Sequence, residues 1–231
     1  MVTGRFTECC GSCLVGWKNF RNLTPGELDL VNKNRSQATF KPGQIIIKQG
    51  SPASQAVFLA SGLAKSFFEG PGNKNYLLEI LMPSSIIIGP GVLVHPKHTF
   101  SLTALTIVDI CFISLEIIDR LIRTNAEFAS GMIKCMSEKS YVAQQRLISI
   151  QRKRMDGRIA EAILFFANEV NKSESFRLIL TRQELGEMTH MTKESVVRIL
   201  KELDTSGIIR SEGTRITILD SGKLKMISEK G

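Results

Sequence analysis

Apolar residues recur at helical spacing near the C-terminal end of the chain, within residues 181–203. One stripe consists of Val196, Ile199, Leu200 and Leu203. This spacing predicts an amphipathic helix with one buried face. Thr192 is the expected N-cap of that helix, and Thr181 with Glu184 forms the capping box of a shorter helix before it. The segment therefore predicts two short helices joined by a turn at 189–191.

Polar and apolar residues alternate directly after these helices. Residues 208–210 and 215–218 have the pattern of two short strands around a turn at 211–214. Gly213 supplies the positive φ that such a turn usually needs. Two capped helices followed by a hairpin are typical of a winged helix-turn-helix.

The second helix also has a solvent face with its own chemistry. Opposite the apolar stripe lie Lys193, Glu194, Val197, Arg198 and Lys201. An arginine can hold O6 and N7 of guanine together, and a glutamate can accept from the cytosine amino group. Glu194 and Arg198 lie near the helix start, where helix-turn-helix proteins contact bases. The alternative is a plain i,i+4 surface pair between these two residues. The capped helices and the hairpin around them favour DNA reading.

The N-terminal two-thirds of the chain has short strand-like runs separated by glycine and proline turns, which predicts a β-rich barrel. The runs are 38–40, 45–48, 56–60, 63–68, 76–82 and 101–107.

A long helix is predicted from about residue 125 to residue 152. Positions stepping by four and three form an a/d seam for a partner helix. This seam consists of Ala129, Ile133, Met136, Ser140, Ala143, Leu147 and Ile150. A second stripe of Phe128, Met132 and Cys135 can face the barrel. The alternative, an amphipathic helix lying only on its own core, explains one stripe and not two.

Residues 181–217, together with the glycine framework of residues 40–62, resemble the CRP/FNR family of bacterial transcription regulators. The resemblance extends over nearly the whole chain. It implies an α+β fold: an N-terminal double-stranded β-roll of the cyclic-nucleotide-binding type, a long dimerisation helix and a C-terminal winged helix-turn-helix. The expected divisions are a cysteine-containing segment at 1–20, a sensor at 21–124, the dimerisation helix at 125–154 and a DNA-binding domain at 155–231.

The resemblance also implies roles for individual residues. The base contacts of the family fall on Lys193, Glu194 and Arg198, and Lys201 lies on the same outward face. The phosphate contacts fall on Thr181, Arg182, Thr192 and Ser195. Lys193 replaces an arginine of the cyclic-AMP receptor branch, and Val197 replaces a serine of the FNR branch. The implied partners are double-stranded DNA with a palindromic operator, a second copy of the chain and RNA polymerase.

The expected effector pocket departs from the cyclic-nucleotide pattern. Members that bind a cyclic nucleotide hold its phosphate with a Gly-Glu pair and, about ten residues on, an Arg followed by Ser or Thr. The matching positions here are Gly89, Pro90, Phe100 and Ser101. A buried phosphate would lack its charged partners, so cyclic AMP is not expected to bind by the usual contacts. A small molecule or a redox signal remains the expected input.

Cysteines offer a second kind of sensor. FNR-type oxygen sensors hold a [4Fe–4S] cluster with N-terminal cysteines and one from the 108–114 strand. The four thiolates here would be Cys9, Cys10, Cys13 and Cys111. The family spacing C-x2-C-x5-C places Asn19 at the third position, which opposes the cluster. The alternatives are a buried, small hydrophobic Cys111 and a reduced N-terminal tail. His95 and His98 could bind haem or a metal, or simply belong to a polar loop.

Composition adds little. The net charge is +8 and the pI about 9.4, but from Asp156 onward 12 basic residues meet 12 acidic ones. No run of about 18 apolar residues and no signal-peptide pattern occur, so we expect no membrane partner and a cytoplasmic location, with five reduced or ligating cysteines. Three histidines and the lack of a nucleophile elbow or phosphate loop argue against an enzyme. The competing classes are a scaffold protein with the same fold and a metal- or haem-dependent enzyme.

Overall fold

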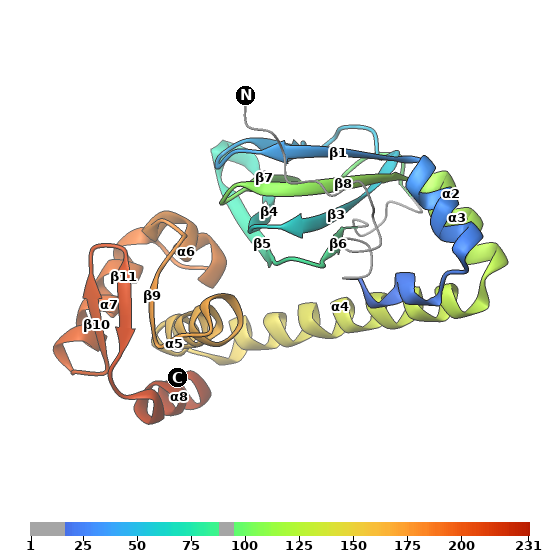
Figure 1. Ribbon diagram of the computed structural model, residues 1–231. Coiled ribbons are helices and arrows are strands. Elements are labelled where there is room, and N and C mark those ends of the chain that lie inside the picture. The colour runs from blue at the N-terminus through green and yellow to red at the C-terminus, as the bar shows by residue number, and fades with distance from the viewer. Residues whose placement is uncertain (1–16, 88–94) are drawn as a thin grey trace. The chain divides into compact units, whose positions relative to one another are not determined.

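The computed structural model describes residues 17–87 and 95–231. The chain divides into two compact units, residues 1–139 and 140–231. The first is rich in β-structure and the second holds the helix-turn-helix, with the long helix α4 (Ala126–Arg152) crossing the division (Figure 1). The predicted fold class is therefore confirmed.

The first unit is built on two four-stranded sheets whose paired strands are all antiparallel. One sheet has the order β1-β8-β3-β6 and the other β2-β7-β4-β5. The strands are β1 (Arg35–Phe40), β2 (Ile45–Ile47), β3 (Gln55–Ser61), β4 (Ala64–Glu69), β5 (Asn75–Leu81), β6 (Ile86–Ile87), β7 (Ser101–Ala104) and β8 (Val108–Ser114). A core of buried residues from both sheets includes Leu59, Leu81, Leu102 and Ile110. This is the β-roll expected from the turn pattern.

One predicted strand is longer than the strand in the structure. The run 101–107 is expected to be continuous, but β7 ends at Ala104. The N–H groups of Leu105 and Thr106 leave the ladder and donate to the carbonyl of Leu63. Gly62 permits this close approach, because a Cβ at its positive φ of 81° would collide with the Ile107 carbonyl.

Helices close one end of the β-roll. They are the 3-10 turn η1 (Lys18–Asn22), α2 (Pro25–Lys33) and α3 (Leu115–Thr124), and a further short turn, η2 (Pro71–Asn73), follows β4. Trp17 lies 4.7 Å from Phe20, 5.3 Å from Phe58 and 5.8 Å from Phe128 between ring centroids. This aromatic cluster joins the N-terminal segment, β3 and α4 in one core. The sequence pattern does not predict α2 or the cluster.

The long helix has the two stripes that its sequence predicts. Phe128 and Met132 are 0% and 4% exposed and pack in the aromatic core, with Cys135 half-buried beside them. On the seam, Ile133 is 69% and Leu147 56% exposed. Ser140 and Ala143 are also exposed, and Ala129, Met136 and Ile150 are half-buried. One stripe packs within the chain, and the large side chains Ile133 and Leu147 of the other are exposed.

The second unit is a winged helix-turn-helix with flanking helices. Its elements after α4 are α5 (Met155–Phe165), η3 (Phe166–Asn171), β9 (Ser175–Arg177), α6 (Arg182–Thr189), α7 (Lys193–Thr205), β10 (Ile209–Glu212), β11 (Arg215–Ile218) and α8 (Ser221–Lys230). The strands form one sheet in the order β10-β11-β9. Ser211 and Glu212, expected in the turn, belong to β10, so the turn is the two-residue Gly213-Thr214, with Gly213 at φ 58°. The sequence pattern does not predict β9 or α8.

The seam on α4 predicts self-association, because large apolar side chains at a and d positions gain stability only against a second helix. We expect the wild-type protein to be a dimer at micromolar concentration. Ile133→Glu combined with Leu147→Glu should convert it to a folded monomer. Sedimentation measures the mass, and circular dichroism checks the fold. Ile107→Glu, at a residue 62% exposed in the β-roll, is the control and should leave the dimer intact. A monomeric wild-type protein would contradict the prediction.

Candidate DNA-binding interface

The two helices of the motif are held in place by their caps. The Thr181 hydroxyl accepts from the N–H of Glu184, and the Glu184 carboxylate accepts from the N–H of Thr181 at 2.7 Å. Thr192 accepts from the N–H of Ser195 at 3.2 Å at the start of α7. His190 ends α6 in the left-handed region at φ 54°. The two caps fix where α6 and α7 begin, and the turn at His190 ends α6.

The second helix presents one buried and one solvent face. Val196, Ile199, Leu200 and Leu203 are all at most 5% exposed. On the other side Lys193, Glu194, Val197, Arg198 and Lys201 are exposed, as the sequence predicted. The other predicted DNA contacts lie at the two helix starts: Thr181 and Thr192 are exposed, and Ser195 is half-buried.

The two central polar side chains of this face are not paired with each other. Arg198 donates to Glu202 at 2.7 Å, and both side chains are more than half exposed. An ion pair this exposed contributes about 0–1 kcal/mol, so DNA can displace it cheaply. The pKa of Glu194 is held below its usual value by hydrogen bonds from its own backbone N–H and from Thr192. Glu194 is therefore an ionised acceptor at the helix start.

Arg182, which the resemblance places at backbone phosphate, bonds to the β10–β11 hairpin in the free protein. Its guanidinium donates to the Gly213 carbonyl at 2.8 Å and contacts the Ser211 hydroxyl at 3.3 Å. Burial lowers the pKa of the Arg182 side chain. On the same strand, the N–H of Ser211 donates to Asp204 at 3.1 Å. Arg182 from α6 and Asp204 from α7 thus hold the β10–β11 hairpin, called the wing below.

Two further arginines hold the C-terminal end of α6, and the sequence pattern does not identify them. Arg146 of α4 donates to the Met188 carbonyl at 2.9 Å. Arg158 of α5 donates to the carbonyls of Thr189 and His190 at 2.8 and 3.2 Å. The last carbonyls of a helix lack intrahelical partners and carry partial negative charge, so cations stabilise them. The turn before α7 is fixed by side chains from two other helices.

In the β-roll, the two described residues of the predicted effector pocket, Phe100 and Ser101, already contact other residues of the protein. Phe100 is 3% exposed in the core between the sheets. The hydroxyl of the fully buried Ser101 accepts from the N–H of Gln49 at 2.9 Å and donates to Glu69. Lys48 forms an ion pair with Glu69 at 2.6 Å, and hydrogen bonds from Lys48 and Ser101 lower the pKa of Glu69. Gly89 and Pro90 lie outside the described residues.

The possible cluster ligands are only partly described. Cys111 is 2% exposed in the aromatic core, with an Arg35 guanidinium nitrogen 3.7 Å from its sulfur. Cys9, Cys10 and Cys13 lie outside the described residues. Burial raises the pKa of the Cys135 thiol. Among residues 17–87 and 95–231, no three Cys, His, Asp or Glu side chains are grouped as metal ligands.

The two candidate haem or metal ligands occupy different environments. His95 is exposed. His98 is buried beside Phe100, and burial lowers the pKa of its imidazole. Its Nδ1 has no hydrogen-bond partner among the described residues.

Comparison with known proteins agrees with this geometry. Residues 37–125 match the cyclic nucleotide-binding domain model, and residues 157–227 match the Crp-like helix-turn-helix domain model. The chain belongs to the CRP/FNR family of transcription regulators. It is thus a regulator with a helix-turn-helix DNA-binding domain, of a family whose members bind DNA and dimerise.

Relatives in sequence and in structure cover most of the chain. It is 25% identical over 211 residues to the Transcriptional activator protein anr of Pseudomonas aeruginosa, covering 88% of this chain and 85% of that protein. It is 22% identical to the CRP-like cAMP-activated global transcriptional regulator of Mycobacterium tuberculosis, covering 89% and 93%. A crp/fnr family regulator from Eubacterium rectale has the same fold, with a TM-score of 0.77 at 17% identity over 93% and 99% of the two chains.

The sequence predicts neither an enzyme nor a membrane protein. The proteins named above are transcription regulators and not enzymes, in agreement with the expected lack of catalysis. No helix in the described part of the chain is long and apolar enough to cross a membrane.

The engaged Ser101 predicts that this CRP/FNR member does not bind cyclic AMP tightly. An entering phosphate would meet the Glu69 carboxylate and find the Ser101 hydroxyl already bonded. Isothermal calorimetry should give no saturable heat at micromolar cyclic AMP, with the Mycobacterium tuberculosis cAMP-activated regulator as positive control. A micromolar Kd, about −8 kcal/mol, would contradict this assignment.

Proposed function

We propose that this chain is a homodimeric regulator that reads a palindromic operator with the exposed face of α7. The observation that carries the proposal is the placement of Glu194 and Arg198 on an exposed face whose reverse side is buried. The N-terminal end of a recognition helix is where base edges are reached in the major groove. Two copies joined through α4 would present two such helices to two half-sites.

Each exposed side chain has a proposed partner. Arg198 holds guanine, Glu194 accepts from cytosine, and Lys193 and Lys201 add contacts at the two sides of this face. Val197 is 48% exposed between the readers and suits a thymine methyl group. Thr181, Thr192 and Ser195 face backbone phosphates, and Arg182 contributes by holding the wing. RNA polymerase is the proposed partner of the DNA-bound dimer, and the cytoplasm the proposed location.

The four proposed segments are the N-terminal segment 1–20, the sensor 21–124, the dimerisation helix 125–154 and the DNA-binding domain 155–231. Two arginines support a link between the last two. Arg146 and Arg158 connect α4 and α5 to the end of α6, so a change in α4 would reach the turn before α7.

We propose that the signal is a small molecule or a redox change sensed in the β-roll. Relatives named Electron transport regulator A, of Shewanella oneidensis, and Anaerobic regulatory protein, of Pasteurella multocida, support the redox version. The family spacing of cluster ligands, with Asn19 at the third cysteine position, weighs against a cluster. Asn19 is itself buried and donates to the Phe128 carbonyl at 2.9 Å. This residue serves the packing of α4.

Base reading predicts a defined result for Arg198. Arg198→Ala should cost about 1–3 kcal/mol at the operator and relax preference at one base pair, while random DNA is bound nearly as before. Arg198→Lys keeps the charge but not the bidentate geometry, so it should lose most of the same specificity. Glu202→Gln, which removes the ion-pair partner of Arg198, is the control and should bind like wild type. Equal losses on operator and random DNA for Arg198→Ala would refute base reading.

The absorption spectrum of protein purified without oxygen separates the proposed signals. We expect a colourless protein with substoichiometric iron and no haem band. A brown protein with four irons per chain would overturn that expectation. Cys111→Ala should then bleach it, and Cys135→Ala, the control in the helix core, should not.

A further inference from the structure

Two arginines lie directly opposite each other on the outer face of the wing sheet. Arg215 of β11 pairs in register with Arg177 of β9. Both are exposed, while Phe176 and Ile216 beside them point into the core. Side chains directly opposite on an antiparallel pair share a face, and like charges there destabilise the sheet. The pair of like charges is therefore expected to destabilise the free protein, and a negatively charged ligand bound between the two arginines would offset that cost.

Neither arginine is neutralised within the described chain. No ion pair or side-chain hydrogen bond joins Arg177 or Arg215 to another described residue. Glu212 of β10 is opposite Arg215 in register, yet forms no ion pair with it. The row Glu212, Arg215, Arg177 therefore keeps a net positive charge and two guanidinium groups with donors to spare.

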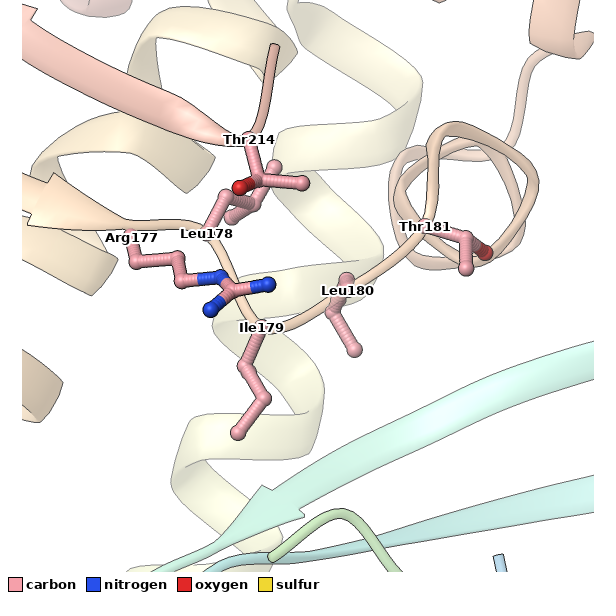
Figure 2. A pocket seen from close by; sticks show the side chains of 6 residues that line it. All are labelled: Arg177, Leu178, Ile179, Leu180, Thr181 and Thr214. Carbon is pink, nitrogen blue, oxygen red and sulfur yellow. The ribbon is translucent and has the colours of Figure 1, made fainter.

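The pair also lies beside the start of the helix-turn-helix. One groove is lined by Arg177, Leu178, Ile179, Leu180, Thr181 and Thr214 (Figure 2). The N–H of Leu178 donates to the Thr214 carbonyl at 2.8 Å, which keeps the end of β9 against the wing turn. Arg177 thus shares a groove with Thr181, the N-cap of α6, and with Thr214 of the wing. Arg177 therefore brings a positive charge to the groove beside the start of α6.

Arg182 does not supply this charge. Its guanidinium is committed to the wing through Gly213 and Ser211. The exposed cations that remain on this face of the wing sheet are the opposed pair Arg177 and Arg215 and, two positions along β10 from Glu212, Arg210.

We propose that Arg177 and Arg215 form a binding site for backbone phosphate of the DNA flanking each half-site, held next to α6 by the wing. This inference rests on the proposed operator binding. The site adds affinity without sequence preference, because phosphates carry no base information. It also explains why the sheet tolerates two adjacent like charges.

The salt dependence of DNA binding tests the site. The logarithm of the DNA-binding constant falls with the logarithm of the salt concentration, and removal of one phosphate contact makes this negative slope shallower by about 0.9. For the dimer, the double variant Arg177→Gln/Arg215→Gln should reduce the magnitude of this negative slope by at least about 1.8, which corresponds to one lost phosphate contact in each half-site. The decrease should be the same on operator and random DNA. On a duplex trimmed to the operator itself, the double variant and the wild-type protein should have the same slope. Lys225→Gln/Lys230→Gln, which removes two exposed charges from α8, is the matched control and should leave the slope unchanged.

Thermal unfolding provides a readout that a merely structural role would not give. Removal of the like-charge pair should leave the melting temperature of the free double variant equal to or above that of wild type. A double variant that keeps the wild-type slope, while the wild-type protein selects its operator, would overturn the phosphate site alone. A weaker slope accompanied by a lower melting temperature would also overturn it, by assigning the arginines to folding. Wild-type protein that binds no DNA would instead refute the proposed function.

Discussion

Burial of one apolar stripe on α7 determines which side chains the DNA-binding unit presents to solvent. Val196, Ile199, Leu200 and Leu203 are nearly inaccessible. Full burial of such side chains contributes about 1.5–3 kcal/mol each. An exposed ion pair such as Arg198–Glu202 contributes about 0–1 kcal/mol. Packing therefore fixes the rotation of the helix, and the polar contacts on its outer face are free to exchange for DNA.

The elements around α7 also help to fix its position in the DNA-binding unit. The capping box at Thr181, the left-handed turn at His190 and the arginines at the end of α6 fix where the helix begins. Arg182 and Asp204 fix the wing beside it. Arg146 comes from α4, whose exposed seam is the proposed dimer surface. The same helix that would join two copies also holds one end of the motif in each copy.

The local sequence pattern predicts the helices, but it does not predict which side chains from distant parts of the chain contact them. The stripe on α7 and both caps follow from residues within a few positions of one another. Arg182 and the wing are about thirty residues apart in sequence, and Arg146 and Met188 are 42 apart. The engagement of Ser101 by Glu69 depends in the same way on which strands pair. Register and tertiary packing decide such contacts, and neither is visible in the periodicity of one segment.

The most direct test is selection of bound sequences from a random pool of DNA duplexes by the purified protein. The dimeric reader predicts an inverted repeat whose half-sites are centred about one helical turn apart, roughly 10–10.5 base pairs. Each half-site should contain a G·C pair that loses its enrichment when Arg198 is replaced by alanine. Recovery of no common sequence, or of a single half-site without its inverted copy, would contradict a dimer that reads DNA through α7.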